Sequence, residues 1–159
     1  MRPPFMLPEV VQYTLPVIAG TAVLLCDAAV RERRCAVAFA LYAPDRTLLD
    51  WAAWRLSSAL NSRHGEYQAL ISGLLAAAAY PHCPLLAFTD DATLADSALA
   101  PFAPSVTDRP WHLRLQAAFA LHPCVTLEYL PRFLNGACHG LARHALNHHC
   151  PLHHTFSPG

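Results

Sequence analysis

The segment NSRHGEYQALISGLLAA, residues 61–77, determines how the rest of the chain is interpreted. Its large apolar residues recur at the spacing of a helix, at Leu70, Ile71, Leu74 and Leu75, with alanines on both sides. This pattern predicts a helix that begins at Glu66, is buried over most of its circumference and is ended by Pro81.

Two apolar runs, one on each side of this helix, predict strands. The run TAVLLCD, residues 21–27, ends at Asp27, and the run LLAFTD, residues 85–90, ends at Asp90. Open α/β sheets bind their ligands at the carboxyl ends of strands, so we expect both aspartates at one rim of the sheet. Only 11 of the 159 residues are Asp or Glu. Three of them at element ends, counting Glu66, therefore indicate a shared role, and carboxylates gathered in this way can hold divalent cations.

The remaining patterns give the order of the elements. Strands are predicted over residues 21–27, 35–42, 47–56, 85–88 and 125–129, and helices from residue 66 and over 92–98, 108–121 and 135–148. Three antiparallel strands followed by alternating helix and strand predict an α/β domain, a five-stranded mixed sheet with helices on both faces. We divide the chain into a proline-rich N-terminal arm or linker (1–19), one domain (20–149) and a mobile, histidine-rich tail (150–159).

Composition restricts the class of protein. Apolar residues make up 54% of the chain, yet no apolar stretch reaches the roughly 20 residues of a membrane span. Cys26, Cys35 and Cys124 lie within or beside predicted strands, where we expect buried, reduced thiols and therefore a reducing, cytoplasmic environment. The formal charge is zero, and all 11 basic residues are arginine. This balance disfavours strong nonspecific binding of nucleic acid but leaves room for a local basic face.

Two segments resemble the ribonuclease H family. Residues 61–77 match the family pattern of Asn, then Ala-Glu-Tyr, Ala-Leu, Gly-Leu and Ala, except that Gly65 replaces the alanine before the glutamate. Residues 130–142, LPRFLNGACHGLA, are similar to the family segment Val-Pro-Arg-x-x-Asn-x-x-Ala-Asp-x-Leu-Ala with its spacing intact. The order of the elements also agrees, and the resemblance covers roughly residues 20–146.

The resemblance implies a ribonuclease H-like domain that hydrolyses the RNA strand of RNA–DNA hybrids, by a two-metal-ion mechanism with Mg²⁺ or Mn²⁺. The residues it implies as catalytic and metal-binding are Asp27, Glu66, Asp90 and His139. The residues it implies for substrate binding are Asn61 and Ser62, which would reach the RNA 2′-hydroxyls, and Arg63 and Arg132, which would contact phosphates.

Two departures from the family pattern favour a different function. The first aspartate is followed by Ala28-Ala29 where the family has Gly-Ser, and His139 stands where the family usually has a fourth carboxylate. Imidazole is a poorer ligand for Mg²⁺ than for Mn²⁺, so we expect Mn²⁺ to support more activity. The alternative is a weak or inactive ribonuclease H-like module with a structural or nucleic-acid-binding role. It would be part of a reverse transcriptase or another polymerase, with residues 1–19 as the tether.

Each of these positions also has an alternative interpretation. Asp27 and Asp90 could cap strand ends, Glu66 could stabilise the dipole of its helix from the first turn, and Asp91 is a rival of Asp90. The turn at residues 31–34 fits a solvated loop better than a binding patch. A zinc site near the carboxyl end is a further alternative, with possible ligands Cys138, His139, His144, His148, His149, Cys150, His153 and His154.

Overall fold

The computed structural model describes residues 20–57, 61–80, 84–148 and 152–155. The predicted N-terminal arm, residues 1–19, lies outside the described residues, as does most of the predicted tail. None of the helices in the described ranges has the length and apolar character needed to cross a membrane.

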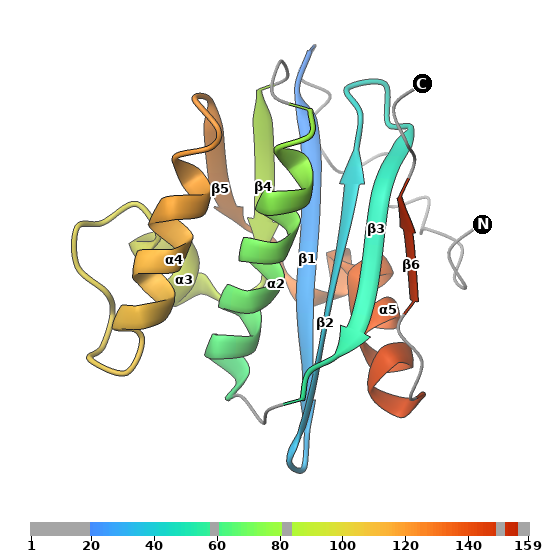
Figure 1. Cartoon of the computed structure of the whole chain (residues 1–159), viewed down its shortest axis with the longest axis vertical. Helices are drawn as coiled ribbons and strands as arrows, with labels where there is room; N and C mark the ends of the chain where they lie inside the picture. The colour runs from blue at the N-terminus through green and yellow to red at the C-terminus, as the bar shows by residue number, and fades with distance from the viewer. Residues whose placement is uncertain (1–19, 58–60, 81–83, 149–151, 156–159) are drawn as a thin grey trace.

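A mixed β-sheet forms the centre of the domain (Figure 1). Its strands are β1 (Ala22–Arg31), β2 (Arg34–Tyr42), β3 (Leu48–Arg55), β4 (Leu85–Thr89), β5 (Val125–Tyr129) and β6 (Leu152–Thr155), in the order β5-β4-β1-β2-β3-β6. The first three strands are antiparallel, whereas β4 and β5 pair in parallel with β1 and β4. The five predicted strands are therefore all present. The sixth, β6, pairs antiparallel with the outer edge of β3, within a segment that the sequence placed in a mobile tail.

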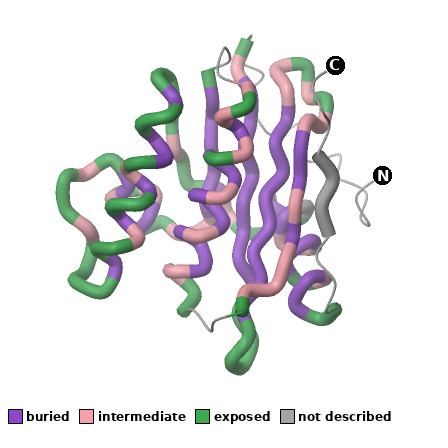
Figure 2. Tube along the Cα trace, viewed as in Figure 1, coloured by how far each residue is buried: buried purple, intermediate pink, exposed green. Residues whose placement is uncertain are grey.

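Helices cover both faces of the sheet, as predicted (Figure 1). On one face lies α2 (Ser62–Ala77), which packs on β1 and β2 and is flanked by α4 (Arg109–Phe119). On the other face lies α5 (Gly136–Asn147), which packs on β1, β2 and β3. The short helix α3 (Ala92–Ser97) and the 3-10 turn η1 (Arg132–Leu134) complete the described helical elements. Two apolar clusters, one on each face, bury the sheet between the helices (Figure 2).

Strand β1 is longer than predicted. The sequence ended this strand at Asp27, but Ala28-Ala29-Val30 continues the pairing with β2 until Arg31 faces Arg34 across a two-residue turn. The parallel partner β4 stops earlier, with Phe88 opposite Leu25. Asp27 therefore lies in the middle of β1, just past the level at which the neighbouring strand ends.

Helix α2 begins earlier than predicted. Asn61 caps it, since the Asn61 side chain accepts a hydrogen bond of 2.8 Å from the backbone N–H of His64. Glu66 therefore lies in the second turn, and the first turn contains no acidic residue. This placement excludes the interpretation of Glu66 as a first-turn residue that stabilises the helix dipole.

Two glycines let α2 approach the sheet closely. A Cβ atom on Gly65 would lie 2.9 Å from the Ala28 Cβ and 3.1 Å from the Cys35 Sγ. A Cβ atom on Gly73 would lie 2.7 Å from a methyl carbon of Leu24. All three distances are shorter than ordinary van der Waals contact, so the crossing of α2 over β1 depends on these missing side chains.

The described cysteines are free thiols. Cys26, Cys35 and Cys138 are buried, and burial raises the pKa of each thiol. Cys124 is exposed, which corrects the expectation that it is buried, because it lies in the loop before the edge strand β5. Buried protonated thiols behave as small apolar side chains in the two clusters.

Candidate metal centre

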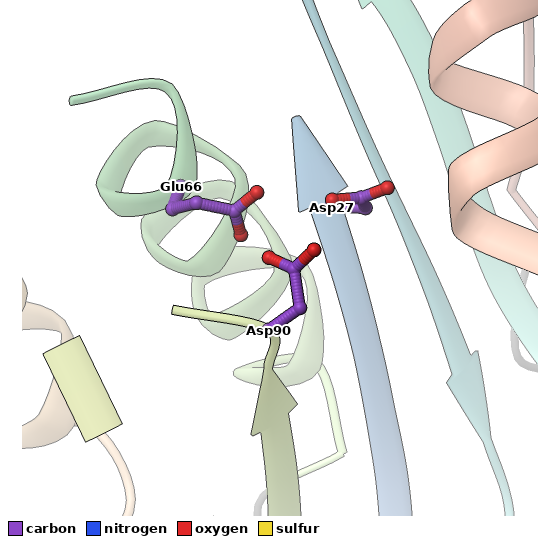
Figure 3. Close-up of side chains that lie close together, drawn as sticks. All are labelled: Asp27, Glu66 and Asp90. Carbon is purple, nitrogen blue, oxygen red and sulfur yellow. The ribbon is translucent and has the colours of Figure 1, made fainter. Parts of the chain in front are cut away.

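Three carboxylates from three separate elements converge at one rim of the sheet (Figure 3). Asp27 comes from β1, Glu66 from α2 and Asp90 from the residue after β4. One ligand oxygen of each lies within 4.8 Å of the others. Asp27 and Glu66 are almost fully buried, and the side chain of Asp90 is 6% exposed. The sequence predicted this convergence from two apolar runs that end at Asp27 and Asp90 and from Glu66 at the expected start of a helix.

Backbone and side-chain donors fix the position of Glu66. The backbone N–H of Ala28 donates to its Oε1 at 3.0 Å, and the Thr89 hydroxyl donates to its Oε2 at 3.5 Å. The N–H of Ala28 is available because β4 has already ended at that level of β1. Glu66 thus links the helix to both neighbouring strands and points its carboxylate toward the two aspartates.

Burial and neighbouring charge perturb two of the carboxylates, Glu66 and Asp27. Burial, followed by the charges of Asp27 and Asp90, raises the pKa of Glu66 far above its usual value. Burial also raises the pKa of Asp27, and the Asp90 charge adds to this effect, although hydrogen bonds to Glu66 and His139 oppose it. The protein thus pays in free energy for holding three acidic groups together, and a bound cation would remove that cost.

The donor set fits a hard divalent cation. All three groups offer carboxylate oxygens, the ligands preferred by Mg²⁺ and Mn²⁺. The Oδ1 atom of Asp27 is buried and has no hydrogen-bond partner, which leaves an acceptor without compensation at the centre of the group. Among the described residues, no other set of three or more His, Cys, Asp or Glu side chains has comparable geometry.

His139 lies beside this group on α5. Its Nδ1 atom is 3.0 Å from Oδ2 of Asp27, and its side chain is 30% exposed. It is not among the three residues whose ligand atoms are all mutually close. In this arrangement, His139 contacts Oδ2 of Asp27, and it would have to exchange that contact to become a fourth ligand.

Asp90 and its rival Asp91 have different surroundings. The Asp91 carboxylate caps α3 by accepting from the Leu94 N–H at 3.0 Å, and it accepts from Arg63 Nε at 3.3 Å. Asp90 faces the other two carboxylates and is paired with Arg132, whose Nε lies 3.0 Å from Oδ2 of Asp90. The structure therefore brings Asp90, and not Asp91, into the carboxylate group.

The predicted substrate-binding residues lie around this rim, and they differ in whether their side chains already have a partner. Asn61 uses its side-chain oxygen to cap α2, and Ser62 is exposed at the start of that helix. Arg63 is held by Asp91 and by Asp108, whose Oδ2 is 3.6 Å from Arg63 Nη1. Arg132 is 60% exposed but paired with Asp90. Phosphate contacts by either arginine would therefore compete with an existing carboxylate.

The sequence did not predict the supporting contacts of three residues. Asn135 is buried and donates from Nδ2 to the Cys26 carbonyl at 2.8 Å, which ties the start of α5 to β1 one residue from Asp27. Thr89 and Ala28 hold Glu66, as described above. The asparagine at position 135 and the threonine before Asp90 belong to the family pattern, which was the available signal for both.

An open groove lies beside the carboxylate group and is lined by His139 and Arg132, the partners of Asp27 and Asp90. It has a volume of about 580 Å³ and follows the free edge of β1 between the start of α2 and the face of α5. Its lining residues are Ala28, Ala29, Val30, Arg31, Ser62, Arg132, His139, Arg143, Leu146 and Asn147. Ser62, Arg132 and His139, three of the predicted site residues, therefore face one open space.

The zinc alternative has limited support in the described residues. His144 and His148 lie one helical turn apart, with ring centroids at 4.1 Å. A third ligand close to both is not found in the described part of the chain. His149 and Cys150 lie outside the described residues.

Comparison with known proteins identifies the fold of the chain through similar solved structures. No protein-family model and no curated protein matches the chain. Among solved structures, ribonuclease H1 from the archaeon Halobacterium salinarum is similar at 21% identity and a TM-score of 0.73, covering 80% of this chain and 98% of that one. LC11 ribonuclease H1 in complex with an RNA/DNA hybrid is similar at 11% identity and a TM-score of 0.68, covering 79% and 96%.

Longer proteins contain the same architecture. The foamy viral protease-reverse transcriptase in complex with an RNA/DNA hybrid is similar at 14% identity and a TM-score of 0.62, covering 91% of this chain and 21% of that one. Similarity at these identities establishes the arrangement of the elements. Together with the sheet order and the helices on both faces, it shows that the chain has the ribonuclease H fold.

Proposed function

We propose that the protein is a metal-dependent endonuclease that cuts the RNA strand of RNA–DNA hybrids. The convergence of Asp27, Glu66 and Asp90 within 4.8 Å at the carboxyl-end rim of the sheet is the observation on which the proposal rests. The similarity to LC11 ribonuclease H1 in complex with a hybrid supports the choice of substrate. Four described cysteines without disulfides support the expectation of a reducing, cytoplasmic environment.

Each carboxylate has a defined role in this proposal. Asp27, Glu66 and Asp90 would hold two Mg²⁺ or Mn²⁺ ions, which in such sites activate water and stabilise the leaving oxygen. Asp27 contacts His139 and lies within 4.8 Å of both other carboxylates, so it would be the central ligand of the set. Ala28 and Thr89 keep the Glu66 carboxylate aimed at the cluster through their hydrogen bonds. Arg132 holds Asp90 in place and is exposed enough to meet a phosphate.

A second candidate is a ribonuclease H-like module with little or no catalysis, within a polymerase such as a reverse transcriptase. The observation that favours it is the contact of His139 with Asp27, because imidazole occupies the position of a fourth carboxylate. The similarity to one fifth of a foamy viral protease-reverse transcriptase is consistent with such a module. In that case, the groove would bind nucleic acid without cutting it.

A cleavage assay separates the two functions. We expect a labelled RNA–DNA hybrid to be cut with Mn²⁺ or Mg²⁺ and to stay intact with EDTA. Asp27→Asn should abolish cutting, because it removes a charged ligand from the centre of the cluster. The matched control is Asp96→Asn, the same change at an exposed position on α3. If the protein binds the hybrid but does not cut it with any divalent cation, the endonuclease is refuted and the non-catalytic module is supported.

Calorimetric titration with Mn²⁺ tests the number of ions independently. We expect two ions per chain in the wild type and fewer in Glu66→Gln. Asp91→Asn should leave the stoichiometry unchanged, since Asp91 points to α3 and Arg63. A single ion in the wild type would refute the two-ion arrangement and leave a one-ion nuclease.

A further inference from the structure

The turn between β1 and β2 carries an unusual concentration of positive charge. Arg31 and Arg34 are directly opposite each other in the register of the two strands, and both are exposed. Side chains directly opposite in an antiparallel pair lie about 5 Å apart at Cβ, and like charges in that position destabilise the pair. Between them, Glu32 adopts a positive φ of 52°, a conformation that non-glycine residues rarely take. The turn is thus built at a cost in stability.

A second hollow lies beside this turn and continues the groove of the carboxylate group. It has a volume of about 240 Å³ and is lined by Arg31, Glu32, Arg34, Leu146 and Asn147. Three of these residues, Arg31, Leu146 and Asn147, also line the larger groove that reaches His139 and Arg132. One continuous surface therefore leads from the candidate metal centre to the turn, which projects beyond the rest of the sheet (Figure 1).

The arginines along this surface differ from the other cations near the site. Arg63 and Arg132 are paired with aspartates. Arg31 and Arg34, in contrast, make no ion pair within the part of the chain that the structure describes. The only acidic side chain that lines the second hollow is Glu32. In a chain with zero formal charge, this hollow is a local excess of positive charge that an anion would compensate.

The position of the turn identifies the anion. Asp27, Ala29 and Arg31 alternate with the residues that face α2, so their side chains lie on the same face of β1. At about 3.3 Å per residue, Arg31 is about 13 Å from Asp27 along the strand, which corresponds to about four base steps along a duplex axis. A nucleic acid strand placed at the carboxylates and lying in the groove would bring its own phosphates to Arg31 and Arg34.

We propose that Arg31 and Arg34, with the side chain of Asn147 on α5 beside them, form a binding site for a backbone phosphate of the hybrid, several nucleotides from the position of cleavage. This site rests on the proposed function, since it binds the same substrate. It holds the duplex in the groove and takes no part in the chemistry. It accounts for the unpaired arginine pair and the unfavourable turn, which an interaction with solvent alone leaves uncompensated.

Binding is measured by fluorescence anisotropy with a labelled hybrid in the Asp27→Asn background, which prevents cutting. We expect Arg31→Ala/Arg34→Ala to weaken binding about tenfold and to reduce the slope of log affinity against log salt by about one, the value for one lost phosphate contact. Because the Asp27→Asn protein does not cut the hybrid, the anisotropy measures binding alone. In the otherwise native protein, kcat at saturating hybrid should stay within about twofold while KM rises.

The matched control is Arg33→Ala/Arg109→Ala, which removes the same charge from the same turn and from α4 but from neither hollow. We expect it to bind within about twofold of the parent. Equal losses in both double variants would show a general effect of charge and would overturn the site. Unchanged binding in Arg31→Ala/Arg34→Ala would overturn it directly. Arg31→Gln/Arg34→Gln, which keeps polar side chains of similar length, provides a second variant, and circular dichroism verifies that each variant is folded.

Duplex length gives an independent measurement. Shortening the hybrid on the side of the turn should weaken binding to the parent protein but not to Arg31→Ala/Arg34→Ala. An equal effect of shortening on both proteins would refute the contact. If the parent binds no hybrid at all, the proposed function itself fails. If the otherwise native protein cuts the hybrid and the Asp27→Asn parent binds it, but the two arginines have no effect, only this phosphate site fails.

Discussion

Exchanging the glycine and the alanine where α2 crosses β1 gives a quantitative test of the packing. The family pattern has glycine after the first aspartate and alanine before the glutamate, whereas this chain has Ala28 and Gly65. The 2.9 Å distance between the Ala28 Cβ and a Cβ built on Gly65 shows that only one of the two positions has room for a methyl group. Ala28 and Gly65 are therefore one exchange: in this chain the glycine is on the helix and the alanine on the strand, the reverse of the family pattern.

The magnitude follows from opposing effects on the free energy of unfolding. Gly65→Ala gains about 1 kcal/mol of helix propensity but overpacks the crossing at a cost of about 1–3 kcal/mol. Ala28→Gly alone loses about 1 kcal/mol from a buried methyl and a more flexible strand. In the double variant the overpacking is relieved, so we expect it to be more stable than the sum of the single changes by about 1–2 kcal/mol.

Urea denaturation of the wild type, both single variants and the double variant gives this coupling energy as a double-mutant cycle. Gly73→Ala is the control, because its added Cβ would meet Leu24 at 2.7 Å and not Ala28. Ala28→Gly should therefore not rescue Gly73→Ala. A coupling energy near zero between positions 28 and 65, or equal rescue at position 73, would refute the explanation.

The remaining predictions concern the charges of the site. His139→Asp should raise Mg²⁺-dependent turnover several-fold, because it supplies an oxygen ligand; unchanged or lower turnover would count against His139 as a ligand. The raised pKa values of Glu66 and Asp27 mean that the folded state binds more protons than the unfolded state above their usual pKa values. Metal-free protein should therefore lose stability as the pH rises from about 5.5 to 8, and Glu66→Gln should weaken that loss; a denaturation series showing greater stability at pH 8 would contradict the sign. Asp108→Ala should cost about 2–3 kcal/mol in urea denaturation, because it leaves His64, now bound at 2.8 Å, and Arg63 without their buried partner.

Local patterns in the sequence were sufficient for most elements of this fold. Strand β5 lies at the predicted residues, and the apolar spacing after Glu66 identified the buried helix. The predicted ends of the elements were less accurate, because the point at which a strand or helix ends depends on contacts with other parts of the chain. Strand β1 continues past Asp27 as β2 pairs with it up to the turn, and α2 starts at Ser62 because the Asn61 side chain caps it.

The site shows the same division between local signals and contacts between distant residues. Apolar runs that stop at an acidic residue indicated Asp27 and Asp90, and the expected start of the apolar helix indicated Glu66. The hydrogen bonds that support these residues were not visible in local patterns, since the bond from the Asn135 side chain to the Cys26 carbonyl joins positions 109 residues apart. The strand β6, in a segment rich in histidine, forms only because the edge of β3 is there to pair with it.

The three carboxylates come from separate elements, so the complete set exists only in the folded chain. They come from β1, α2 and the end of β4, so no fragment that lacks one of these elements contains the whole set. An unfolded chain has the same acidic residues, but no structure holds their carboxylates close together. Ions that bind only the assembled set shift the equilibrium toward the native state, so their affinity can be measured as added resistance to denaturant. Ion binding is in this sense a reporter of completed folding.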